Sequence, residues 1–151
     1  MRFRQELLLV LHGSAPEDVL AWGTFPRFNQ LFPGQVTPTT VRAISTDPNS
    51  DGLADTIEIN VRVPPSGGFA VHGVELALFF DYSFYEVVQL NMSSAVFLES
   101  SYPVQGSRLQ VYGDLRWAQT GPLLCGGTQT TYETPLLSNE NISVFEDVQF
   151  D

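Results

Sequence analysis

The sequence contains no lysine, a single cysteine and two histidines, and each scarcity argues against a class of function. Seven arginines are set against seventeen acidic residues, a formal net charge of -10 that makes nucleic acid an unfavourable partner. Cys125 cannot form an internal disulfide and has no second cysteine at the spacing of a thiolate zinc site. The chain is therefore expected to fold through its hydrophobic core rather than through cross-links.

Long apolar runs are also missing. The most apolar stretches, Leu7 to Leu11 and Val74 to Phe80, are far shorter than the roughly 18 residues of a membrane-spanning helix. No signal peptide is visible either. Two Asn-x-Ser sequons, at Asn91 and Asn141, are typical of glycan acceptors and favour a luminal or extracellular location. A luminal chain without targeting or anchoring segments is expected to be one domain of a longer protein.

Catalytic motifs are absent as well. The chain has no glycine-rich phosphate loop and no Gly-x-Ser-x-Gly elbow. His12, His72 and Cys125 lie in sequence contexts that supply no third catalytic member, so each is interpreted as a structural side chain. A pair of facing carboxylates would suit glycoside hydrolysis, but no spacing in the sequence identifies one. An enzyme is disfavoured.

Short apolar segments separated by Pro and Gly turns predict an all-β fold. In the segment after Asp55, Ile57, Ile59, Val61 and Val63 fall on one face with polar residues between them, a period of two that is typical of a half-buried strand. The whole chain, residues 1–151, is predicted to form a single antiparallel β-sandwich domain of about eight strands. The expected strands are 3–11, 36–44, 56–63, 69–82, 85–97, 108–119, 128–133 and 142–150.

The loop between two of these strands has the spacing of a calcium site. Acidic or amide side chains recur at every second position before Gly52, which permits a sharp turn. The predicted ligands are the side chains of Asp47, Asn49, Asp51 and Asp55 with the backbone carbonyl of Leu53. Two alternatives remain open. The same letters up to Glu58 fit an EF-hand, in which Glu58 would be a further ligand, and Asp-Pro-Asn-Ser-Asp-Gly can also form a turn that needs no metal.

A proline-interrupted aromatic segment, residues 22–34, precedes the loop. One interpretation is that it covers an open side of the core, because buried aromatic rings contribute strongly to core packing. The other is that it presents a contact surface, since aromatics beside an arginine are typical interface anchors. The candidate interface residues are Trp22, Phe25, Arg27 and Phe28.

Five stretches span most of the chain: residues 20–29, 47–55, 95–107, 111–116 and 124–127. Together, and in this order, they resemble the transmembrane protein 231 family of the ciliary transition zone. The Thr-Phe-Pro and Gly-Asp-Leu-Arg segments are the more specific parts, whereas the acidic loop also occurs in unrelated calcium modules.

The resemblance implies an extracytoplasmic domain between two membrane helices. It further implies work with the Meckel-syndrome and tectonic proteins in the barrier that controls entry of membrane proteins into the cilium and supports cilium assembly. This sequence lacks both helices, so it resembles the isolated ectodomain or a fragment of it. The alternative is a calcium-dependent carbohydrate-binding or adhesion module of the same fold class.

Overall fold

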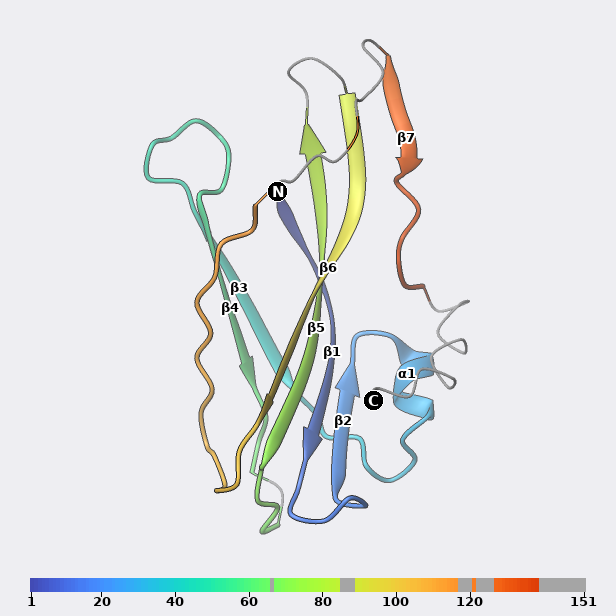
Figure 1. The fold of residues 1–151 in the computed structure, drawn as a ribbon, viewed down its shortest axis with the longest axis vertical. Helices are drawn as coiled ribbons and strands as arrows, with labels where there is room; N and C mark the ends of the chain where they lie inside the picture. The colour runs from blue at the N-terminus through green and yellow to red at the C-terminus, as the bar shows by residue number, and fades with distance from the viewer. Residues whose placement is uncertain (66, 85–88, 117–120, 122–126, 139–151) are drawn as a thin grey trace.

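A computed structural model describes residues 1–151 with the exception of 66, 85–88, 117–120, 122–126 and 139–151. Its main feature is a five-stranded sheet in the order β2-β1-β5-β6-β7 (Figure 1). The strands are β1 (Arg2–His12), β2 (Val19–Gly23), β5 (Gly73–Phe84), β6 (Gln89–Ser101) and β7 (Thr128–Tyr132). Strands β1, β2, β5 and β6 pair antiparallel, whereas β6 and β7 pair in parallel.

A two-stranded hairpin, β3 (Thr40–Thr46) and β4 (Thr56–Arg62), packs against one face of the large sheet. Leu7, Leu9 and Leu11 of β1 are buried on that face. Ile57, Ile59 and Val61 of β4 pack onto them, while the residues between these three are exposed. The predicted alternation of this strand is confirmed, and it explains how the hairpin buries only one side.

The opposite face of the large sheet is covered by the aromatic segment. A short helix, α1 (Pro26–Gln30), follows β2, and Phe25 at its N-cap packs edge-on against Phe79 of β5 with ring centroids 5.7 Å apart. Ala77 and Leu137 complete this second buried cluster, with Phe28 packed at its side. The large sheet is therefore buried on both faces near its centre, which fits the apolar run of β1.

The predicted β-rich class with antiparallel pairing is confirmed, whereas the predicted sandwich of about eight strands is not, because the described residues form a five-stranded sheet and a two-stranded hairpin. Strand β2 was not expected, and β7 is parallel to its neighbour. The expected strand at 108–119 does not form over its described part, since residues 107–116 are exposed and unpaired. Residues 108–116 have the composition of a strand, but no neighbouring strand in the described part of the chain lies where they could pair with it. The expected strand 142–150 lies outside the described residues.

Candidate functional site

The acidic loop joins β3 to β4 at the free end of the hairpin (Figure 1). It closes through its own side chains. The carboxylate of Asp47 accepts hydrogen bonds from the backbone N–H groups of Asp51 and Gly52, at 3.3 and 2.9 Å. The side chain of Asp51 accepts from the backbone N–H of Leu53 at 2.8 Å and from the Asn49 amide at 3.0 Å. Ser50 and Gly52 adopt positive φ angles of 58° and 85°, as a turn of this tightness requires.

Three of the predicted calcium ligands, Asp47, Asn49 and Asp51, are therefore neighbours in space. Asp55 instead lies directly before β4, and its backbone N–H donates to the carbonyl of Thr46 at 3.0 Å. Within the described residues no three His, Cys, Asp or Glu side chains gather closely enough to hold a metal ion. The loop geometry satisfies the metal-free turn as it stands, and each carboxylate keeps acceptor positions that its N–H partners do not use.

The aromatic candidates do not share one environment. Phe25 is only 6% exposed and is part of the core, so it serves as cover for the sheet. Trp22 packs against the cluster on the hairpin side, and Phe28 against the cluster on the opposite side. Arg27 is exposed on α1. Of these four residues, Arg27 keeps the accessibility that an interface anchor needs.

The first sequon lies inside β6. Asn91 pairs with Ser83 of β5 and is partly buried, and its side-chain amide donates to the carboxylate of Glu133 at 2.9 Å. A glycan on this nitrogen would have to replace the Glu133 contact. Asn141 lies outside the described residues, and glycosylation of both sites stays a prediction.

One ionisable contact was not visible in the sequence. His12 Nε2 lies 2.6 Å from the Glu75 carboxylate, a pair that the register between β1 and β5 brings together on adjacent strands. The backbone N–H of His72 donates to the carbonyl of His12 at 2.8 Å. Both histidines thus take part in holding strand ends together. Cys125 lies outside the described residues.

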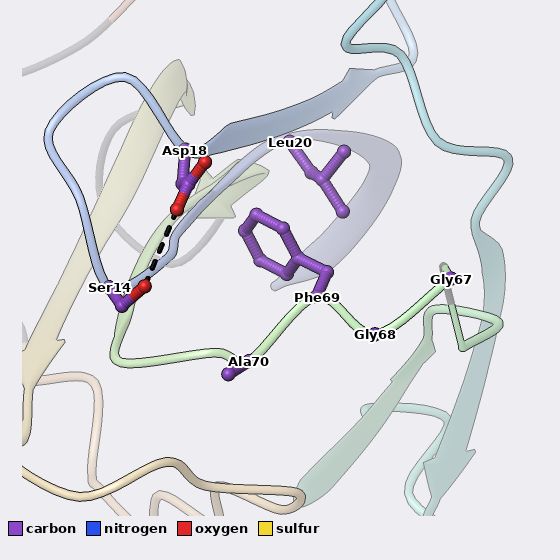
Figure 2. A pocket seen from close by; sticks show the side chains of 7 residues that line it. All are labelled: Ser14, Asp18, Leu20, Gly67, Gly68, Phe69 and Ala70. Atoms are coloured by element: carbon purple, nitrogen blue, oxygen red, sulfur yellow. Dashed lines mark hydrogen bonds between the residues drawn. The ribbon is translucent and has the colours of Figure 1, made fainter.

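An open surface pocket of about 520 Å³ lies between the β1–β2 turn and the segment that precedes β5. Figure 2 shows its lining, with Phe69 and Leu20 on one side and the Ser14–Asp18 hydrogen bond on the other. The Asp18 carboxylate already accepts from the Ser14 hydroxyl and the Ala15 N–H, at 3.4 and 3.3 Å. Asp18 is the one carboxylate in the lining of this pocket, and it is hydrogen-bonded within its own turn. The described lining therefore does not contain the pair of carboxylates that a glycosidase uses.

Comparison with known proteins decides the family. The family described as "Transmembrane protein 231" matches residues 1–151. The chain belongs to the transmembrane protein 231 family. The human and Bos taurus proteins of that name are each 39% identical over 139 residues, which cover 91% of this chain and 44% of the relative. The Xenopus tropicalis protein is 30% identical over 141 residues, 93% of this chain and 45% of the relative.

The family resemblance expected from the sequence is thereby confirmed, and the chain spans less than half the length of these curated relatives. No solved structure matches the chain. Among the residues that the structure describes, no helix has the length and apolar character needed to cross a membrane.

Proposed function

We propose that this chain is the extracytoplasmic interaction module of a ciliary transition-zone membrane protein. In this role it contributes to the diffusion barrier that controls which membrane proteins enter the cilium. The observation that carries the proposal is the family match over the whole chain. The membrane helices that the family resemblance implies would flank this domain, and the partners would be the Meckel-syndrome and tectonic proteins of the same complex.

The exposed segment after β6 suits a non-enzymatic binding role. Residues 102–116 leave β6 as an extended chain without strand pairing (Figure 1). Large apolar side chains in this segment face solvent, Tyr112 most of all at 86% exposed. The others are Tyr102, Val104, Leu109, Val111 and Leu115. Exposed apolar side chains gathered in one segment are a common mark of a protein contact.

To test this role, the matched segment of the human relative is replaced by residues 1–151 of this chain, and the chimera is isolated from ciliated human cells. We expect Meckel-syndrome and tectonic proteins to be recovered with it. A Val111→Ser, Tyr112→Ser double variant should lose most of this recovery, because it removes exposed apolar contacts without touching the core. Leu53→Ser, at an exposed apolar position in the acidic loop, is the control. Equal recovery with both variants would contradict the assignment of the segment.

We further propose that the acidic loop binds calcium as a structural ion, with Asp47, Asn49, Asp51, the Leu53 carbonyl and Asp55 as ligands. The three neighbouring oxygen-bearing side chains support this proposal. The Asp55 side chain would have to turn toward these three side chains, and Glu58 is a possible further ligand. Calcium is a hard cation that takes six to eight oxygen ligands. When bound, it would neutralise the negative charge of the carboxylates that the loop brings close together.

Calcium should raise the melting temperature of the domain. At a calcium concentration about a hundredfold above the dissociation constant, the gain is about 2.7 kcal/mol. Differential scanning calorimetry in millimolar calcium and in excess chelator measures the shift. Asp51→Ala should abolish the response, whereas Asp114→Ala, an exposed carboxylate outside the loop, should keep it. A melting temperature that chelation leaves unchanged would assign the loop to the metal-free turn.

A further inference from the structure

Among the residues that the structure describes, one edge of the large sheet is open over most of a long strand. β6 pairs with β5 from Leu90 to Ser101. On its other side β7 pairs only with Gln89, Leu90 and Met92 (Figure 1). The bridge between Met92 and Tyr132 extends the contact with β7 to the outward N–H of Ser93, and in the described part of the chain no strand pairs with the outer edge of residues 94–101. Such an edge presents unpaired backbone donors and acceptors to any strand that fits.

The outer edge of β2 and the edges of the hairpin are protected, and the edge strand β7 is only five residues long. The outer edge of β2 is taken up by residues 35–37, since Ala21 donates to the Gln35 carbonyl at 2.9 Å and accepts from the Thr37 N–H at 3.1 Å. The hairpin edges carry charged side chains, Arg42 on β3 and Glu58 and Arg62 on β4. Residues 93–101, Ser-Ser-Ala-Val-Phe-Leu-Glu-Ser-Ser, contain a single charge. Phe97 at the centre is 65% exposed.

The direction of the free backbone groups follows from two hydrogen bonds. The N–H of Gln89 donates to the Gly127 carbonyl, away from β5, and the N–H of Tyr102 donates to the His72 carbonyl, toward the β5 side. Backbone groups alternate along a strand, and the β5–β6 register has no shift. Ser93, Ala95, Phe97, Glu99 and Ser101 therefore point their N–H and C=O groups outward.

We propose that this edge pairs antiparallel with the same edge of a second copy of the chain, about a two-fold axis at Phe97. Centred on Phe97, the pairing uses residues 94–100 of each copy and leaves Ser93 to β7. In that register Phe97 of one copy lies opposite Phe97 of the other. The two residues can exchange both of their backbone hydrogen bonds, because the N–H and C=O groups of Phe97 point outward. Glu99 lies opposite Ala95, Val96 opposite Leu98, and Ser94 opposite Ser100.

The edge favours a second copy over an unrelated strand because it is self-complementary. A two-fold interface requires that each residue fit the residue opposite it on the same stretch of the other copy. In this register the only charged residue, Glu99, meets a small apolar side chain rather than a like charge. The two Phe97 rings form a cross-strand aromatic pair. The interface is small and each copy carries a net charge of -10, so the dimer is weak and forms at high concentration.

Sedimentation of the 151-residue chain tests the proposal. Over about 1 µM to 1 mM protein, in salt on the order of 0.5 M to screen the net charge, the parent should shift from monomer to dimer. Phe97→Lys and Phe97→Glu should each raise the dissociation constant about tenfold or more, because each places like charges opposite one another and removes the aromatic pair. Mixed in equal amounts, the two variants should form a heterodimer, since lysine then faces glutamate.

Tyr112→Lys, at another exposed aromatic residue, should dimerise as the parent does. Circular dichroism should show that both Phe97 variants melt close to the parent, which separates a lost contact from a lost fold. A parent that stays monomeric throughout overturns the proposal. So does a dimer that Phe97→Lys leaves intact, or a mixture that fails to restore pairing. The proposal does not depend on the ciliary role.

Discussion

Leu7→Ala is expected to lower the free energy of unfolding by about 3 to 5 kcal/mol. The Leu7 side chain is completely buried, and it lies in the cluster where the hairpin packs against the large sheet. β1 also pairs with both β2 and β5, so a cavity at this point weakens contacts between three strands and the hairpin. Because a domain of this size is stable by only about 5 to 15 kcal/mol, a loss of this size is a large share of the total.

Urea unfolding followed by fluorescence measures the change. The matched control is Leu115→Ala, the same substitution at a side chain that is 53% exposed, and its effect should stay within about 0.5 kcal/mol. Similar losses for the two variants would mean that the hairpin does not form a core with β1.

Phe25→Ala is expected to cost about 3 to 5 kcal/mol as well. Its ring meets Phe79 at an interplanar angle of 85°, an edge-to-face arrangement that adds to the area buried. Removing it opens the second cluster, in which Leu137 and Ala77 are also buried. The aromatic segment would then no longer seal this face of the sheet.

The control for Phe25 is Phe97→Ala on the same face of the sheet, measured at low protein concentration. Phe97 lies opposite Ala77 of β5 but is largely exposed, so its loss should leave stability nearly unchanged. A Phe25→Ala variant that keeps the parent's stability yet loses partner binding would instead support the interface role considered for this residue.

Local patterns of the sequence were sufficient for much of this fold. The alternation of Ile57, Ile59 and Val61 identified β4 and its buried face, because a period of two depends only on residues close in the chain. The adjacency of β5 and β6 followed from the short connection between them. The contact of Asp47, Asn49 and Asp51 was also predictable, since a tight turn brings alternate residues together.

Long-range pairing was not predictable in the same way. The parallel arrangement of β6 and β7 depends on where the chain returns after the intervening segment. β2 is only five residues long and leads into the Pro-containing aromatic segment, so the sequence did not predict a strand at this position. The contact of His12 with Glu75 arises from the register between β1 and β5, which no local pattern encodes. Residues 108–116 show the converse, a strand pattern without a partner strand.

The most direct test of the proposed function is ciliary entry of a membrane protein that the transition zone normally excludes. Human cells lacking transmembrane protein 231 would receive the chimera that carries residues 1–151, and fluorescence of the excluded protein in the cilium would be compared with that in the surrounding membrane. The account predicts that the chimera restores exclusion and that its Leu7→Ala form does not. A chimera that is expressed and reaches the ciliary base, yet leaves entry as high as in the deficient cells, would contradict it.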